Sequence, residues 1–140
     1  MIEIDWPAIE RAAIDVRARA YAPYSGYAVG SALLTGSGQL FVGCNVENAS
    51  YGLCICAERS AIVQMVAADA RDPIAIVVVT KGPVPAAPCG MCRQTLAEFA
   101  VDLPIRLLAS DDPSATIETT LAELLPRAFR ADALSKKDAC

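Results

Sequence analysis

Two short segments of the chain carry residue types that can bind a metal and move protons. The first reads "CAE", from Cys56 to Glu58, and the second, about 30 residues further on, reads "PCGMC", from Pro88 to Cys92. Each segment opens a stretch with the apolar spacing of a helix. Free backbone N–H groups and the positive dipole end at a helix N-terminus favour anionic sulfur, so we expect these thiols to ionise readily and bind a metal.

The three cysteines of these segments, Cys56, Cys89 and Cys92, predict a zinc site. Soft thiolates favour zinc over hard cations, and catalytic zinc sites use three protein ligands and leave a fourth position for water. Glu58 lies two residues from Cys56, close enough to contact that water. The alternative is a closed structural site with Cys54 or Cys44 as the fourth thiolate, although a structural site needs no glutamate beside a ligand.

Composition excludes several other kinds of function. The sequence contains no histidine, which rules out Ser–His–Asp and Cys–His catalysis and every histidine-ligated metal site. A net charge of −4 argues against a nucleic-acid partner, because phosphate neutralisation needs clustered Lys and Arg. The chain is 54% hydrophobic and 20% charged, an apolar surplus that we expect to be buried partly between subunits.

The sequence predicts a cytoplasmic protein without a membrane segment. No apolar run approaches the roughly 20 residues of a membrane span, and the N-terminus "MIEIDWPAIERAA" lacks the order of a signal peptide. An unexported chain with a good apolar core needs no disulfide framework, so we expect its six cysteines to be thiols or metal ligands.

Apolar periodicity predicts alternating helices and strands in the order αββαβαβα. This order indicates an α/β fold, a three-layer α-β-α sandwich around a mixed sheet, in a single domain over residues 1–132 with a flexible tail over residues 133–140. The expected helices are Pro7–Tyr21, Ala57–Ala70, Gly90–Ala100 and one after a capping box at Thr120 and Glu123, and the expected strands are Val29–Thr35, Leu40–Val46, Ile74–Thr80 and Ile105–Ala109.

Zinc deaminases of nucleobases carry His/Cys-x-Glu followed by Pro-Cys-x-x-Cys, with the glutamate as acid and base, and the two segments above fit this pattern. The chain resembles the small homotetrameric cytidine deaminases of pyrimidine salvage. The matching stretches are "YSGYAVGSAL", "GCNVENASYG", "CAERSA", "PCGMCRQ" and, near the end, "ELLPRAF".

The resemblance implies a role for each residue of the metal centre. Cys56, Cys89 and Cys92 hold one zinc ion per subunit, and Glu58 is the proton shuttle. Arg59, three residues after Cys56, donates hydrogen bonds to the thiolates and offsets their negative charge.

The resemblance also assigns six residues to the substrate. They are Asn45 and Glu47 at the ribose 3′-hydroxyl, Tyr27 beside the pyrimidine, the backbone of Ala57 at the base, Tyr51 at a subunit junction, and Phe129 reaching into a neighbour's active site. The chain departs from the family at Tyr27 where Phe is usual, at Ser31 where Ala is usual, and at Cys54 beside the motif.

Each of these residues also has an ordinary structural interpretation. Glu58 can be an acid favoured by the helix dipole, and Asn45 and Glu47 can organise a turn. Arg59 can be a surface charge, Cys44 a small buried hydrophobe, and the aromatic residues can pack in the core or an interface.

The implied reaction is zinc-dependent hydrolytic deamination of cytidine and 2′-deoxycytidine to uridine and 2′-deoxyuridine plus ammonia. The expected partners are a nucleoside and further copies of the chain in a homotetramer with shared active sites, with no nucleic acid and no membrane. The alternatives are a deaminase of a nucleoside-like antibiotic such as blasticidin S, a tRNA or polynucleotide deaminase, which the acidic sequence disfavours, and a noncatalytic zinc-stabilised assembly module.

Overall fold

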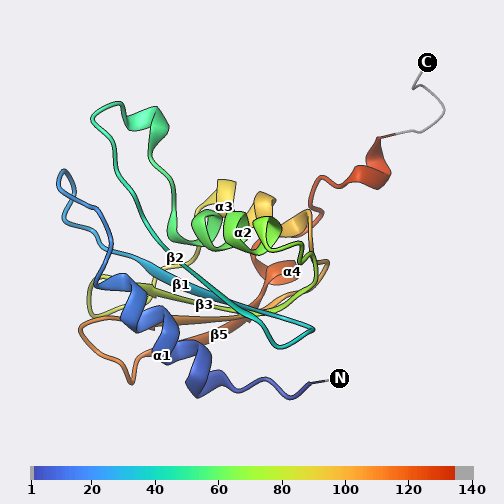
Figure 1. Cartoon of the computed structure of the whole chain (residues 1–140), viewed down its shortest axis with the longest axis horizontal. Helices are drawn as coiled ribbons and strands as arrows, with labels where there is room; N and C mark the ends of the chain where they lie inside the picture. Colours follow the sequence, from blue (N-terminus) through green and yellow to red (C-terminus); the bar gives the residue numbers. More distant parts are fainter. Residues whose placement is uncertain (1, 135–140) are drawn as a thin grey trace.

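A five-stranded sheet in the order β2-β1-β3-β4-β5 forms the centre of the molecule (Figure 1). The computed structural model describes residues 2–134. Neighbouring strands are antiparallel except for β3 and β4, which are parallel. The elements are α1 (Trp6–Arg17), β1 (Gly30–Thr35), β2 (Leu40–Cys44), η1 (Tyr51–Leu53), α2 (Ala57–Ala67), β3 (Pro73–Thr80), α3 (Gly90–Ala97), β4 (Pro104–Ala109), β5 (Thr116–Thr120), α4 (Leu121–Leu124) and η2 (Ala131–Ala133).

Helices cover both faces of the sheet, with α1 on one face and α2 and α3 on the other (Figure 1). Strand β3 shows why its sequence is continuously apolar. Ile76 and Val78 pack in the cluster beneath α2 and α3, whereas Val77 and Val79 pack in the cluster beneath α1. Both faces of this strand are therefore buried, as expected for a central strand. The predicted three-layer α/β fold is confirmed.

Several predicted helices are too long at their C-terminal ends. Helix α2 stops at Ala67 rather than Ala70, because Asp69 adopts a positive φ of 62° that no helix contains. In α3, the last N–H groups bond three residues back, as from Phe99 to Leu96, which tightens the final turn beyond Ala97. The first helix ends at Arg17, four residues before the predicted end at Tyr21.

Strand β5 is absent from the predicted order. Only Ile117 among its five residues is apolar, and the strand lies at the sheet edge against β4. The capping box predicted just after it is confirmed: Thr120 Oγ1 accepts from the Glu123 N–H at 3.3 Å, and Glu123 Oε2 accepts from the Thr120 N–H at 3.1 Å. The predicted flexible tail begins at Ala133, within η2, and its residues 135–140 lie outside the described residues.

Within residues 2–134, no helix is both long and apolar enough to cross a membrane.

Ser31 on β1 is a buried hydroxyl without a hydrogen-bond partner among the described residues. We expect Ser31→Ala to raise the free energy of unfolding by about 1 kcal/mol, because burial of an unpaired polar group costs energy that alanine avoids. Denaturant unfolding measures this change. Ser60→Ala is the matched control, since the Ser60 hydroxyl donates to the Cys44 carbonyl at 3.1 Å and its loss should lower stability. A lower stability for Ser31→Ala would contradict the prediction.

Candidate active site

The N-termini of α2 and α3 bring three thiols together. Cys56 is the N-cap residue of α2, Cys89 is the N-cap residue of α3, and Cys92 lies in the first turn of α3. Their sulfur atoms all lie within 4.8 Å of one another, and those of Cys56 and Cys89 are 3.7 Å apart. Tetrahedral zinc with Zn–S bonds of about 2.3 Å needs sulfurs roughly 3.8 Å apart, so the cluster has the right size and donor type for zinc.

The thiols differ in how readily they lose a proton. A hydrogen bond from Cys92, helped by Arg59, lowers the pKa of Cys56 to about 5, whereas the same hydrogen bond and burial raise the pKa of the Cys92 thiol. Of these two thiols, Cys56 is therefore the more acidic. All five described cysteines, which include Cys44 and Cys54, are free thiols.

Arg59 lies beside the cluster, where the sequence places it. Its Nη2 donates to the Cys56 sulfur at 3.9 Å and to the Cys54 carbonyl at 3.2 Å. The guanidinium is therefore fixed at the edge of the thiols, where its positive charge partly offsets theirs.

Glu58 is a buried carboxyl in the first turn of α2, and only 4% of the residue is exposed. Burial raises its pKa, and the negative charge of Cys56 raises it further. A carboxyl with a raised pKa exchanges protons more easily near neutral pH, and it lies where a reacting group in the cavity can reach it.

Glu58, together with Cys56 and Cys89 of the thiol cluster, lines a cavity of about 260 Å³. The cavity lies beside the C-terminal ends of β2 and β3. Its walls come from the loops before β1, after β2 and before α3. The lining residues are Tyr27, Val29, Asn45, Glu47, Cys54, Ile55, Cys56, Glu58, Thr80, Ala86, Ala87 and Cys89.

Asn45 and Glu47 line the cavity and hold the loop before β1. Asn45 Oδ1 accepts from the Val29 N–H at 2.8 Å, and its Nδ2 donates to the Tyr27 carbonyl at 2.8 Å. The Glu47 carboxylate accepts from the N–H groups of Tyr24 and Ser25 at 3.0 and 3.1 Å, and also from the Ser25 hydroxyl. These bonds to Ser25 and Tyr24 lower the pKa of Glu47, so its carboxylate stays charged.

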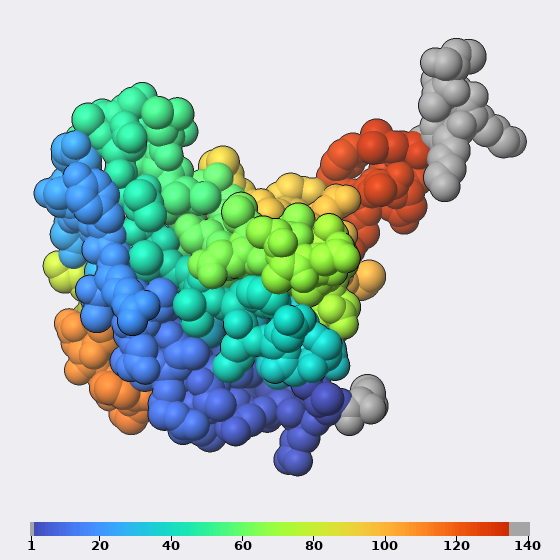
Figure 2. Space-filling model, in the orientation of Figure 1, coloured from blue at the N-terminus to red at the C-terminus, as the bar shows by residue number. Residues whose placement is uncertain are grey.

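The other residues assigned to the substrate fall into two groups. Tyr27 lines the cavity, and Ala57 is buried as the first residue of α2. Tyr51 and Phe129 lie outside the cavity and are 75% and 62% exposed. Figure 2 shows the segment around residue 130 projecting away from the body, on the far side of α2 and α3 from the segment around residue 50.

Sequence reasoning missed Val29, Ile55, Thr80, Ala86 and Ala87 as cavity residues. The signal at Thr80 is its place, as a polar residue at the carboxyl end of a strand that is otherwise apolar. The alanines carry no chemical signal, because they contribute only a wall.

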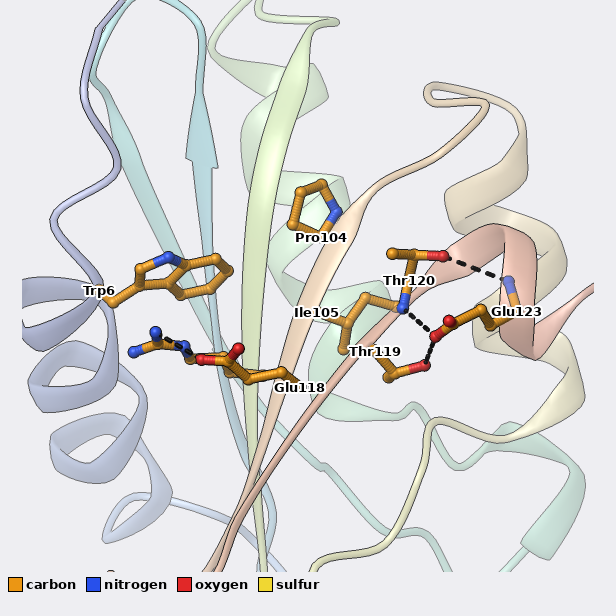
Figure 3. Close-up of a pocket in the computed structure, with 8 residues that line it drawn as sticks. Trp6, Pro104, Ile105, Glu118, Thr119, Thr120 and Glu123 are labelled. Atoms are coloured by element: carbon orange, nitrogen blue, oxygen red, sulfur yellow. Dashed lines mark hydrogen bonds and ion pairs between the residues drawn. The ribbon is translucent and has the colours of Figure 1, made fainter.

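A second depression, of about 320 Å³, lies between α1 and the β4–β5 edge (Figure 3). Each of its charged side chains has a partner. Arg106 contacts Glu10 at 2.9 Å and Glu118 at 2.6 Å and lies 4.4 Å from the ring centre of Trp6. Glu123 belongs to the capping box of α4. This depression contains no thiol, and its side chains tie α1 to the sheet.

Comparisons with known proteins agree with the geometry. Residues 7–105 match the family described as the cytidine and deoxycytidylate deaminase zinc-binding region. A cytidine deaminase of Halalkalibacterium halodurans is 48% identical over 125 residues, which cover 86% of this chain and 90% of the relative. A cytidine deaminase of Mycobacterium tuberculosis is 35% identical over 142 residues and covers 98% of both chains.

A solved structure shows the same fold. The cytidine deaminase from Burkholderia pseudomallei superimposes with a TM-score of 0.85 at 45% identity, over 90% of this chain and 100% of that chain. The resemblance drawn from the sequence is confirmed, as is the expectation of an enzyme that uses zinc. The chain belongs to the cytidine and deoxycytidylate deaminase family and is a zinc-binding enzyme of that family.

Proposed function

We propose that the chain catalyses the hydrolytic deamination of cytidine and 2′-deoxycytidine, in the cytoplasm and as a step of pyrimidine salvage. The products are uridine or 2′-deoxyuridine and ammonia. The observation that carries the proposal is the buried Glu58 carboxyl beside the thiols, in one cavity with Asn45 and Glu47. Relatives that are named cytidine deaminase, and that match this chain over most of their length, support the same reaction.

Cys56, Cys89 and Cys92 would hold the zinc ion. Zinc bound there supplies a Lewis acid that lowers the pKa of water at an open fourth position. Arg59 hydrogen-bonds the Cys56 sulfur and limits the negative charge that three thiolates bring to the metal.

Glu58 moves the protons of the reaction. It takes one proton from the attacking water as the new C–O bond forms at C4, and delivers it to ring N3. It then transfers the second proton of that water to the exocyclic amine, so that the C4–N bond breaks and ammonia leaves. A raised pKa suits both halves of this task, since the carboxyl must accept and release a proton in each cycle.

The charge of the cavity favours a nucleoside over a nucleotide. Within residues 2–134, the lining of the cavity contains the carboxyl groups of Glu47 and Glu58 and no lysine or arginine. A 5′-phosphate that entered this cavity would meet two carboxyl groups and no cation in the lining to bind it. We therefore expect cytidine and 2′-deoxycytidine to react much faster than deoxycytidylate, as ammonia release from each compound will show.

Glu47→Gln is expected to raise the KM for cytidine by about tenfold, because the loss of the charged acceptor weakens its hydrogen bonds to the ribose hydroxyl and to Ser25. Steady-state kinetics with cytidine measure the change. Glu98→Gln is the matched control, since Glu98 is an exposed glutamate at the end of α3. An unchanged KM for Glu47→Gln would remove this residue from the substrate site.

Ammonia release from a panel of substrates tests the proposal. The panel is cytidine, 2′-deoxycytidine, cytosine, adenosine and blasticidin S, each offered to the zinc-loaded chain. We expect turnover of both cytosine nucleosides. No ammonia from cytidine would overturn the proposal. Exclusive turnover of blasticidin S would identify an antibiotic deaminase, and a shift of tRNA in a gel at moderate salt would favour a polynucleotide substrate.

We also propose a homotetramer in which subunits share active sites. Tyr51 and Phe129 are exposed, and so are Leu53 on η1, Val63 on α2 and Met91 on α3. Large apolar side chains left exposed in a single chain support an interface between copies. A monomer by light scattering would overturn this part of the proposal, as would a Phe129→Ala variant with unchanged KM.

A further inference from the structure

The segment from Ala86 to Pro88, directly before Cys89, is held at both of its ends by side chains. The Ala86 N–H donates to Thr80 Oγ1 at 3.0 Å. The Pro88 carbonyl accepts from Arg93 Nε at 2.7 Å. Ala86 and Ala87 form one wall of the catalytic cavity, and Cys89 contributes its sulfur to the thiol cluster.

Thr80 is a rigid anchor. It is buried at the end of β3, where it pairs with Ala109 of β4, and its carbonyl accepts from the Ser110 N–H at 2.8 Å. The position of the Thr80 hydroxyl is therefore fixed by the central strands of the sheet. The loop that hydrogen-bonds to this hydroxyl is fixed relative to the sheet, unlike a loop that bonds only within itself.

Arg93 is the second anchor and lies one turn after Cys89 in α3. Besides the Pro88 carbonyl, its guanidinium donates from Nη1 to the Leu124 carbonyl at the end of α4, at 2.8 Å. The two acceptors lie on different segments, and one planar guanidinium serves both. This geometry suits arginine and not lysine, whose ammonium offers no fixed fork of donors.

We infer that Thr80 and Arg93 are positioning residues of the active site, an inference that rests on the proposed function. Thr80 sets the wall formed by Ala86 and Ala87, and Arg93 sets the peptide that leads into Cys89. Arg93 acts on the metal through Cys89, and Thr80 acts on the substrate through the wall that it holds, beside its own place in the cavity lining. Partners that orient metal ligands commonly change metal affinity or activity by about 10- to 100-fold when they are lost.

Thr80→Val tests the first anchor, because valine keeps the branched shape and removes the hydroxyl. We expect the KM for cytidine to rise about fivefold, as for the loss of one neutral hydrogen bond, with kcat little changed. Thr80→Ser restores the acceptor and should restore the KM. Thr35→Val is the matched control: Thr35 is also buried, and its hydroxyl accepts from the Gln39 N–H at 3.2 Å, at the opposite end of the sheet.

Arg93→Gln tests the second anchor. We expect zinc to transfer to a competing chelator at least about tenfold faster than from the unaltered chain, and we expect Arg93→Lys to recover little of the loss. Arg71→Gln is the matched control, since the Arg71 guanidinium donates to the Val66 and Ala70 carbonyls at the far end of α2.

Zinc transfer requires no turnover, so it tests Arg93 even if cytidine is not the substrate. Failure of the proposed function would show as absent ammonia release from the unaltered chain. The positioning role would be wrong if Thr80→Val and Arg93→Gln lost only thermal stability, to the extent of their controls, and kept the unaltered KM and zinc transfer rate.

Discussion

Glu58→Gln is expected to lower kcat for cytidine by about 10²- to 10⁴-fold, the range that general acid–base catalysis contributes. Glutamine keeps the size of the side chain and its hydrogen-bonding capacity but cannot carry a proton from the water to the base. Because Glu58 is buried beside the thiols and is not one of them, we expect zinc to remain bound in the variant. Cytidine should still bind, since Asn45 and Glu47, the residues proposed for its ribose, lie elsewhere in the cavity.

Three measurements on the same preparation decide this prediction: zinc content, single-turnover ammonia release, and binding of cytidine to the inactive protein. Glu123→Gln is the matched control. It changes a glutamate in the first turn of a helix, as Glu58 is, but one that caps α4 outside the catalytic cavity. It should cost some stability and leave kcat unchanged. A nearly unaltered kcat in Glu58→Gln would exclude this residue as the proton shuttle.

The thiol cluster could be predicted because its sequence signals are local. Cys56 and Cys89 each stand immediately before a run of helical periodicity, and the structure makes each the N-cap residue of a helix. The sequence alone does not show that the two helix N-termini lie together. The sheet order brings them together, since both helices cover one face of the sheet and begin near the end of β3.

Contacts between residues that lie far apart in the sequence could not be found in this way, even where one of the residues was itself predicted for the site. The Glu47 carboxylate binds Tyr24 and Ser25, more than 20 positions earlier, because the segment before β1 pairs with the segment after β2 through the Tyr21–Val46 bridge. Arg93 reaches the Leu124 carbonyl, 31 positions later. No periodicity marks such pairs. Their side-chain types are ordinary for a loop or a helix surface, and only the folded chain brings them together.

Strand β5 and the exposed aromatic residues show a second limit. The edge strand has one apolar residue, Ile117, so its pairing follows from the free edge of β4 and not from its own pattern. Tyr51 and Phe129 are exposed in a single chain. Their assignment to a shared active site depends on a second copy, and it stays a prediction for the Phe129→Ala variant to test.

Gly43→Ala is expected to disrupt the active site by pushing α2 away from β2. A Cβ atom at Gly43 would lie 2.2 Å from the Ala57 carbonyl oxygen and 2.5 Å from the Ala61 nitrogen. Both are backbone atoms of α2, which cannot rotate away as a flexible side chain can. The helix must therefore move off β2, and it carries Glu58 with it. We expect a loss of about 1–3 kcal/mol in stability, as for other overpacked cores, together with weaker zinc binding and a lower kcat.

Gly30→Ala is the control that separates a displaced site from a merely destabilised fold. A Cβ atom at Gly30 would lie 2.2 Å from the Ala13 carbonyl oxygen, an equally close approach, but on α1 across the sheet. Chemical denaturation and zinc titration of both variants give the comparison. We expect similar losses of stability and a loss of zinc affinity only in Gly43→Ala. Equal zinc affinity in the two variants would mean that the thiol cluster tolerates movement of α2, because Cys89 and Cys92 on α3 would then hold the metal without a fixed Cys56.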